Sequence, residues 1–126
     1  MNAPHESPFK GKTGVRRVVN AFHYSLSGLR AAYTCEDAFR QEALLALLLI
    51  PLALYLPVGG LGRALMISSV LLVLIIELIN SAVEATVDRI SLDNHRLAKR
   101  AKDIGSAAVL FALINVVVVW VCVLWG

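Results

Sequence analysis

The chain has 126 residues, of which 58% are hydrophobic and 17% are charged. This apolar share is higher than a soluble domain needs, so the composition predicts a small integral membrane protein. A soluble helical bundle is the alternative, but several apolar segments are long enough to cross a bilayer, which argues against it. Twelve Lys and Arg against nine Asp and Glu leave a net charge of +3. The positions of these charges are more informative than their sum.

Residues 1–13 contain two prolines and few apolar groups, which predicts a mobile tail. This segment has no apolar core of the secretory type, so we expect the first membrane span to direct insertion. From residue 14 to residue 33 apolar side chains recur at helical spacing. The pattern predicts an amphipathic helix in the membrane interface, with arginines directed toward lipid headgroups. For each arginine, direct phosphate binding is the alternative role.

Three membrane spans are expected over residues 36–56, 62–89 and 103–125, so residues 14–126 form one membrane domain. Pro51 lies inside the first span, where proline is tolerated. Residues 57–60 are expected to form a tight turn, and residues 91–102 a polar, basic linker. Trp120 and Trp125 would mark the membrane interface at the end of the last span.

The basic residues predict the orientation. They are frequent before the first span and between residues 89 and 102, whereas the 57–62 turn has none and Arg63 stands alone. By the positive-inside rule, the N-terminus and the 89–102 loop are cytoplasmic and the C-terminus lies outside. Cys35 and Cys122 would then lie near opposite membrane faces. That separation, about 30 Å across the bilayer core, excludes a disulfide between them.

The second span carries a stripe of polar groups, which we call the acidic stripe. At about 100° per residue, its members fall within one narrow face of the helix. Carboxylates are costly at bilayer depth and usually face a bundle interior or an aqueous cavity. An oxygen-rich surface of this kind suits a hard cation such as Mg²⁺. The alternative is a polar seam that only fixes helix packing, although such seams favour small residues over repeated carboxylates. The stripe consists of Glu77, Asn80, Ser81, Glu84 and Asp88.

Glu36, at the start of the first span, has two possible partners. It could form a helical pair with Arg40, four residues away, or it could face the lower end of the acidic stripe. Carboxylates beside Arg17, Lys102 and Asp103 would supply the parts of a phosphoryl-transfer site at the cytoplasmic rim. Glu77 lies deeper and could accept a proton from a lipid hydroxyl. The chain has no Walker-type loop, so the residues alone do not identify ATP as a ligand. They predict a membrane protein with a metal site.

Four segments add a family resemblance, in the order and spacing that the family shows. They are GLRAAY at 28–33, AFRQE at 38–42, ELINSAVEATVDR at 77–89 and AKDIGSAAV at 101–109. On these segments, residues 14–126 resemble the bacterial integral-membrane diacylglycerol kinase family. The chain departs from the family at Leu26, Ser27 and Tyr33, where relatives carry Trp, Lys and Trp.

The resemblance implies an ATP-dependent lipid kinase of the bacterial inner membrane, with no nucleic-acid partner. It implies a homotrimer with sites between subunits, in which Glu36 and Glu84 hold Mg²⁺ and Glu77 is the general base. Asn80 and Asp88 would support the site. The implied ATP contacts are Arg17, Tyr24, Glu36, Glu84, Asp93, Asn94, His95, Lys102 and Asp103. The implied lipid contacts are Arg17, Arg30, Arg40, Glu42, Glu77 and Ser106.

Several functions remain open on the sequence alone. The family has a diacylglycerol branch and an undecaprenol branch, and the AFRQE and DIGSAAV segments look more like the former. A cation channel or a non-catalytic assembly subunit would use the stripe differently. A channel needs polar groups through the whole span, but residues 64–76 offer only Ser68 and Ser69. The half-length stripe therefore favours a site that opens to one side of the membrane.

Overall fold

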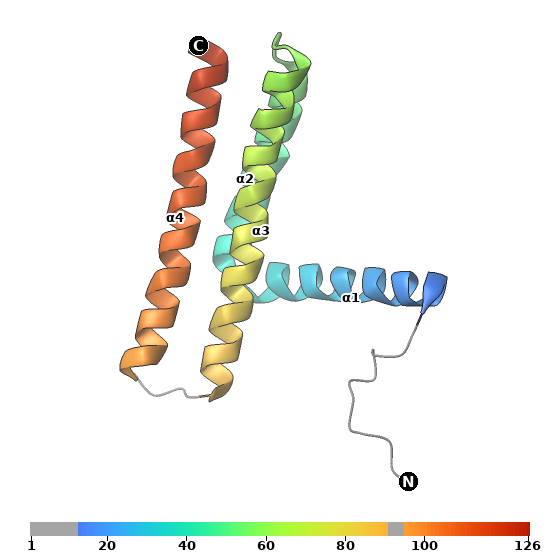
Figure 1. The fold of residues 1–126 in the computed structure, drawn as a ribbon, viewed down its shortest axis with the longest axis vertical. Helices are drawn as coiled ribbons and strands as arrows, with labels where there is room; N and C mark the ends of the chain where they lie inside the picture. The colour runs from blue at the N-terminus through green and yellow to red at the C-terminus, as the bar shows by residue number, and fades with distance from the viewer. Residues whose placement is uncertain (1–12, 91–94) are drawn as a thin grey trace.

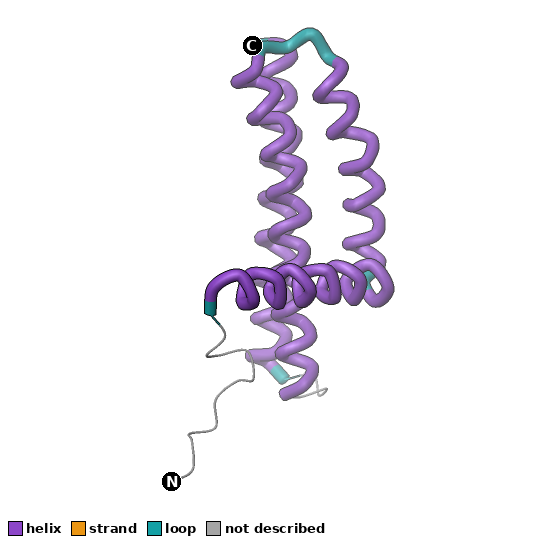
Figure 2. The backbone as a smooth tube through the Cα atoms, turned by 90° about the vertical axis from the view of Figure 1, so that its right-hand side faces the viewer, coloured by secondary structure: helices purple, strands orange, loops and turns teal. Residues whose placement is uncertain are grey.

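The computed structural model describes residues 13–90 and 95–126, which form four helices and, within these ranges, no strand. They are α1 (Gly14–Cys35), α2 (Asp37–Tyr55), α3 (Gly60–Ile90) and α4 (Arg96–Trp125). In Figure 1, α2, α3 and α4 stand side by side and α1 lies crosswise to them, as Figure 2 shows from a second side. The predicted all-α membrane fold is confirmed. The predicted tail falls almost wholly on residues 1–12, outside the described ranges.

The last helix begins earlier than the sequence pattern indicates. The polar composition predicts a linker through residue 102, but α4 already starts at Arg96. Leu97, Ala98 and the basic residues that follow are strong helix formers, which outweigh their polarity. His95 also caps this end, because its Nδ1 accepts a hydrogen bond of 3.0 Å from the backbone N–H of Leu97. The linker prediction is wrong for residues 96–102.

The three long helices are each long and apolar enough to cross a membrane. At 1.5 Å per residue, the 19 residues of α2 span about 28 Å and the 31 residues of α3 about 46 Å. A hydrocarbon core of about 30 Å therefore accommodates α2 but not the whole of α3. Figures 1 and 2 show α3 and α4 continuing past α1 at their lower ends. Because these ends carry Arg89, Arg96 and Arg100, we expect them to extend beyond the hydrocarbon and α1 to lie near its boundary.

Helix α3 is central, since it packs against both α2 and α4. Close contacts fix the antiparallel register of α3 and α4. A Cβ on Gly62 would come within 2.9 Å of Val123 Cγ1, and the indole N–H of Trp120 donates to the Met66 carbonyl at 3.3 Å. Near the other end, Lys102 and Asp88 form an ion pair of 2.6 Å. The buried apolar side chains of the three long helices are Phe39, Ala46, Ala53, Met66, Val70, Val73 and Ala112.

Arg63, to which the sequence pattern gives no role, joins α3 to the end of α2. In an uninterrupted helix the Ala53 carbonyl would accept from the N–H of residue 57, but that residue is Pro57. Arg63 Nε donates to Ala53 O at 3.1 Å, and Arg63 Nη2 donates to Leu56 O at 3.0 Å. The guanidinium therefore satisfies a carbonyl that proline leaves without its helical partner.

The corner between α1 and α2 is held by Arg40. Its Nη1 donates to the carbonyls of Tyr33 at 2.7 Å and Thr34 at 3.1 Å, which are among the last carbonyls of α1. Arg40 also forms an ion pair with Asp37. Glu36 is extended, with φ −119° and ψ 110°, so it interrupts the helix. The pairing of Arg40 with Glu36 is therefore replaced by pairing with Asp37.

Candidate active site

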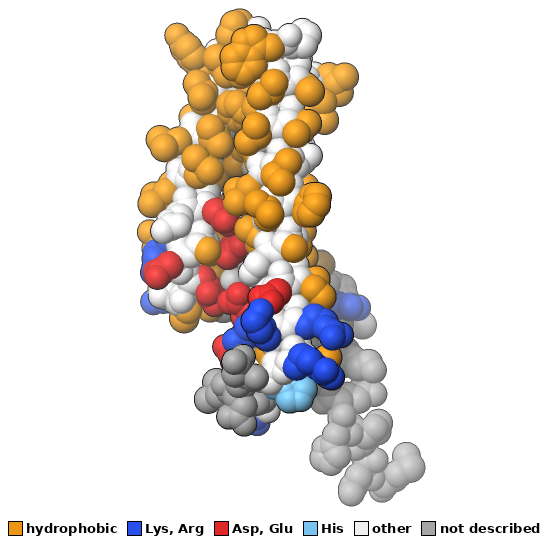
Figure 3. Space-filling model, turned by 90° about the vertical axis from the view of Figure 1, so that its left-hand side faces the viewer, with side chains coloured by type: hydrophobic (Ala, Val, Ile, Leu, Met, Phe, Trp, Pro, Cys, Tyr) orange, Lys and Arg blue, Asp and Glu red, His pale blue; other side chains and the backbone are white. Residues whose placement is uncertain are grey.

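The acidic stripe lies on the face of α3 that turns into the bundle. Glu77 and Asn80 are buried, with 4% and 8% of their surface exposed. Ser81, Glu84 and Asp88 are half-buried, so burial decreases toward the end of α3 that extends past α1. Figure 3 shows acidic side chains in the lower half of the bundle, Lys and Arg beyond them, and a hydrophobic upper half. The polar site therefore opens toward one end of the molecule.

Carboxylates from three places in the chain converge around Glu77. Glu84 and Glu36 both repel its charge, as does Glu42 of α2, which lies near enough to interact with it. Glu36 lines one groove together with Ser81 of the stripe, which favours the second of the two roles expected for it. Glu42 also borders a cavity of about 180 Å³, whose other lining side chains are apolar. A divalent cation would offset the repulsion between such carboxylates.

Asn80 connects the stripe to α4. Its Nδ2 donates to Glu84 Oε1 at 3.4 Å, while its Oδ1 occupies the space where a Cβ on Gly105 would stand. Asn80 Oδ1 is buried without a hydrogen-bond partner in the described residues, as are Ser81 Oγ and Glu42 Oε2. Buried polar atoms are usually satisfied, so three unpartnered oxygens around one carboxylate cluster mark a place suited to a polar ligand.

Helix α4 brings one cation to the stripe. Lys102 contacts Asp88 at 2.6 Å and lies close enough to Glu84 to interact with its charge. Asp103 is instead paired with Lys99 at 2.6 Å and is exposed. His95 is exposed and occupied as a helix cap. Of the predicted ATP contacts on α4, the chain therefore places only Lys102 against the carboxylates.

The predicted contacts on α1 are exposed side chains. Arg17 and Arg30 are exposed, and within the described residues no ion pair joins them to the stripe. Tyr24 is 48% exposed, and Ser106 on α4 is exposed as well. Asp93 and Asn94 lie outside the described residues.

A groove of about 680 Å³ runs between α1 and α3. Glu36 and Ser81 contribute polar groups to it, and the remaining walls are almost entirely small or apolar. The groove thus places lipid-compatible surface beside the acidic stripe at the depth of α1. Its walls include Gly28 and Ala32 of α1 and Leu78 and Ala82 of α3.

Among the described residues, no three His, Cys, Asp or Glu side chains are grouped closely enough to hold a metal ion. Glu36 and Glu84 nevertheless supply the hard oxygen donors that Mg²⁺ prefers. The residues present thus fit the ion by their chemistry, and their roles as metal ligands stay a prediction.

Comparison with known proteins identifies the family. The family model for prokaryotic diacylglycerol kinase matches residues 23–124. The chain belongs to the prokaryotic diacylglycerol kinase family. It is 56% identical over 120 residues to the diacylglycerol kinase of Pseudomonas aeruginosa, covering 95% of this chain and 98% of that protein.

More distant members agree with this assignment. The diacylglycerol kinase of Escherichia coli K12 is 52% identical over 114 residues, which cover 90% of this chain and 93% of that protein. The diacylglycerol kinase of Helicobacter pylori 26695 is 44% identical over 115 residues, which cover 91% of this chain and 89% of that protein. The resemblance seen in the four segments is therefore confirmed, and the chain is an integral membrane enzyme of a lipid kinase family.

Two residues with clear structural roles were missed by sequence reasoning, Gly105 beside the site and Arg63 near the opposite end of α3. Gly105 lies within the AKDIGSAAV segment, but only the structure shows that it makes room for Asn80. For Arg63 the sequence does contain a signal. Pro57 has no N–H, so the carbonyl of Ala53, four residues before Pro57, needs another donor. No comparable signal marks Gly105, since the contact joins two helices far apart in sequence.

Proposed function

We propose that this protein transfers the γ-phosphoryl group of MgATP to the hydroxyl of 1,2-diacylglycerol, giving phosphatidic acid and ADP. The observation that carries the proposal is the burial of Glu77 on α3 among neighbouring carboxylates. In this proposal α3 runs from the bilayer to the water. Relatives named diacylglycerol kinase at 56% and 52% identity support the choice of lipid. The AFRQE and DIGSAAV segments favour the same branch.

In this proposal Glu77 is the general base. Its carboxylate accepts the proton of the lipid hydroxyl, whose oxygen forms a bond to the γ-phosphorus while the bond to the β-phosphate oxygen breaks and ADP leaves. Asn80 donates to Glu84 and holds that carboxylate in position.

The nucleotide is assigned to the end of α3 and α4 that extends past α1. Glu36 and Glu84 would hold Mg²⁺, which when bound offsets the negative charge of the phosphates. Lys102, positioned by Asp88 at 2.6 Å, would bind phosphate oxygens as a point charge. The further proposed ATP contacts are Arg17, Tyr24, Asp93, Asn94, His95 and Asp103.

The lipid is assigned to the level of α1, where apolar walls meet the carboxylates. The cavity beside Glu42 and the groove beside Glu36 both offer apolar surface next to acidic groups. Arg30, Arg40 and Ser106 are the further proposed lipid contacts, although Arg40 is already engaged by backbone carbonyls of α1.

We propose that the N-terminus and the segment between α3 and α4 face the cytoplasm, where ATP is present. Basic residues concentrated there support this orientation. We also propose a homotrimer with sites shared between subunits. The proposed nucleotide contact Arg17 lies on α1, is exposed, and has no ion pair with the stripe among the described residues. A second copy of the chain would bring such an arginine to the stripe.

The substrate is tested by incubating purified protein in mixed micelles with ATP labelled on the γ-phosphate, with diacylglycerol and undecaprenol in separate reactions. Labelled phosphatidic acid is the expected product. Label in undecaprenyl phosphate alone would move the protein to the sister branch with the same base. Label in neither lipid, from protein shown to be folded, would contradict the proposal. The acidic stripe would then be reassigned to packing or ion passage.

A further inference from the structure

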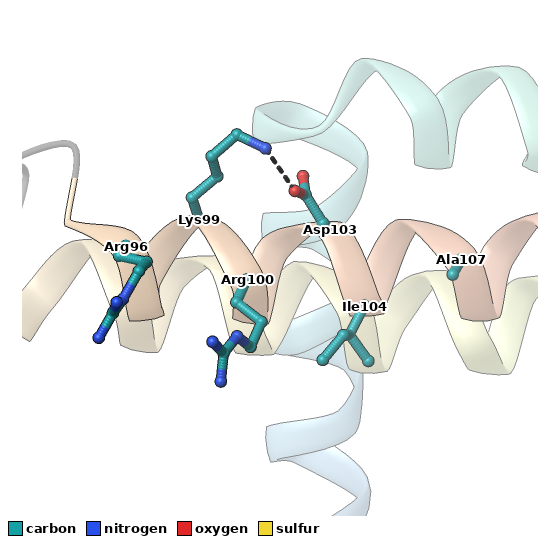
Figure 4. A pocket seen from close by; sticks show the side chains of 6 residues that line it. All are labelled: Arg96, Lys99, Arg100, Asp103, Ile104 and Ala107. Carbon is teal, nitrogen blue, oxygen red and sulfur yellow. Dashed lines mark hydrogen bonds and ion pairs between the residues drawn. The ribbon is translucent and has the colours of Figure 1, made fainter.

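One face of α4 carries arginines that the proposed reaction does not use. Arg96 and Arg100 lie one helical turn apart and project from the same side of the helix, as Figure 4 shows. Neither has a hydrogen-bond or ion-pair partner among residues 13–90 and 95–126. Lys99 leaves this side of the helix and pairs with Asp103 at 2.6 Å. Two unpaired guanidinium groups therefore lie close together on one surface.

This face lies opposite the contact between α4 and α3. At about 100° per residue, with Gly105 at 0°, Arg96 falls at about 180° and Arg100 at about 220°. Gly105 meets Asn80 of α3, so the two arginines project away from the bundle. They also lie away from Lys102, which turns toward Asp88. The arginine face is thus turned away from Lys102 and the acidic stripe, and it borders Asp103, a proposed ATP contact that is paired with Lys99.

Apolar side chains continue the arginine face toward the hydrocarbon. Ile104, Ala107 and Phe111 fall between about 200° and 260° on the same helical projection. Ile104 is 63% exposed and Phe111 is 70% exposed. Ile104 and Ala107 line a shallow hollow together with Arg96 and Arg100. The other two side chains that line it, Lys99 and Asp103, neutralise each other in an ion pair. One continuous face therefore changes from cationic to aliphatic along the helix axis.

The change occurs at the depth of the lipid phosphates. Gly105 faces Asn80, which lies at the level of α1 near the hydrocarbon boundary. At 1.5 Å per residue, Arg100 lies about 7 Å beyond that level. The headgroup layer adds about 5 to 8 Å to each side of the hydrocarbon. Arg100 is therefore at phosphate depth, and the long side chain of Arg96, one turn further out, can reach the same headgroup.

We propose that Arg96 and Arg100 bind the headgroup phosphate of an anionic phospholipid, whose acyl chain lies along Ile104, Ala107 and Phe111. The guanidinium groups match phosphate oxygens in geometry and charge. The aliphatic part of the face distinguishes a membrane lipid from a soluble phosphate, because a soluble anion would gain nothing from it. This site holds a structural or regulatory lipid and is distinct from the lipid that is phosphorylated.

The test uses the full-length protein in detergent micelles with phosphatidylglycerol or phosphatidylcholine of identical chains. Native mass spectrometry counts the lipids retained by the wild type, Arg100→Gln, the double variant R96Q/R100Q and Arg89→Gln. Arg89 is a matched control, since it is an exposed arginine near the end of α3 at a similar depth. The purified variants are compared at equal oligomeric state.

We expect the wild type and Arg89→Gln to retain phosphatidylglycerol in preference to phosphatidylcholine. Arg100→Gln should lose about fivefold of that preference, and the double variant on the order of tenfold or more. Arg100→Lys, which keeps the charge, should retain most of it. Added ATP should leave the retained lipid unchanged, because Lys102 and the acidic stripe, to which the phosphates are assigned, lie on the other side of α4.

Three results would overturn the proposal. The first is equal phosphatidylglycerol preference in the wild type and the double variant. The second is loss of the bound lipid when ATP is added, which would place the arginines in the nucleotide site. The third is a double variant whose oligomeric state changes while its lipid preference does not, which would make this face a contact between copies of the chain.

Discussion

Replacement of Arg63 by methionine tests how the end of α2 is held. Methionine keeps much of the length of the side chain but removes both hydrogen bonds, which are 3.1 Å to Ala53 O and 3.0 Å to Leu56 O. Hydrogen bonds in membrane proteins contribute about 0.6 to 1.7 kcal/mol each, so the expected loss of unfolding free energy is about 1 to 3 kcal/mol. Ala53 O has no backbone donor to replace the guanidinium, since residue 57 is proline.

The measurement is equilibrium unfolding in micelles, followed by circular dichroism, with Arg89→Met as a control that removes an exposed arginine. A double-mutant cycle sharpens the reasoning. Pro57→Ala restores an N–H that can bond Ala53 O, so Arg63→Met should cost less in that background than in the wild type. If Arg63→Met lowers the unfolding free energy equally in both backgrounds, or in neither, then Arg63 does not compensate for the missing N–H of Pro57.

Three further variants or conditions address the site. Gly105→Ala should push Asn80 away from Glu84, because the added Cβ takes the space of the Asn80 oxygen. We expect a loss of about 1 to 3 kcal/mol in unfolding free energy. We also expect a lower kcat for lipid phosphorylation, measured on the same preparation. Lys102→Met should raise KM for ATP more than KM for lipid, and equal effects on both would contradict its assignment to phosphate. Chelation of divalent ions should abolish turnover, and added Mg²⁺ should restore it; turnover that survives chelation would remove Glu36 and Glu84 from a metal-binding role.

The helices could be predicted from the sequence because their signals are local. Long apolar runs, the 57–60 turn and the amphipathic pattern of α1 each lie within one segment. The predicted start of α4 is too late because the polar composition of residues 96–102 masks their helix propensity. The side chain of His95 caps the helix, but a histidine is a weaker start signal in a sequence than Ser, Thr, Asp or Asn.

The site could be predicted only in part. The stripe on α3 follows from helical periodicity, so the sequence alone places Glu77, Asn80 and Glu84 on one face. The convergence of Glu36 and Glu42 on Glu77 depends on the packing of α2 against α3, which periodicity does not determine. The pairing of Asp103 with Lys99 competes with its predicted role toward the nucleotide, and a sequence pattern gives no measure of which partner is favoured.

The central claim is that Glu77 is the base of a lipid kinase, and turnover of Glu77→Gln tests it most directly. The amide keeps the shape of the side chain and removes proton acceptance, so the account predicts a folded protein with turnover reduced about 10² to 10⁴-fold. Asp37→Asn is the control, because Asp37 is an exposed carboxylate whose ion pair with Arg40 lies at the surface. The rate is that of labelled γ-phosphate transfer to diacylglycerol, with folding checked by circular dichroism. Turnover of Glu77→Gln equal to that of the wild type would contradict the account.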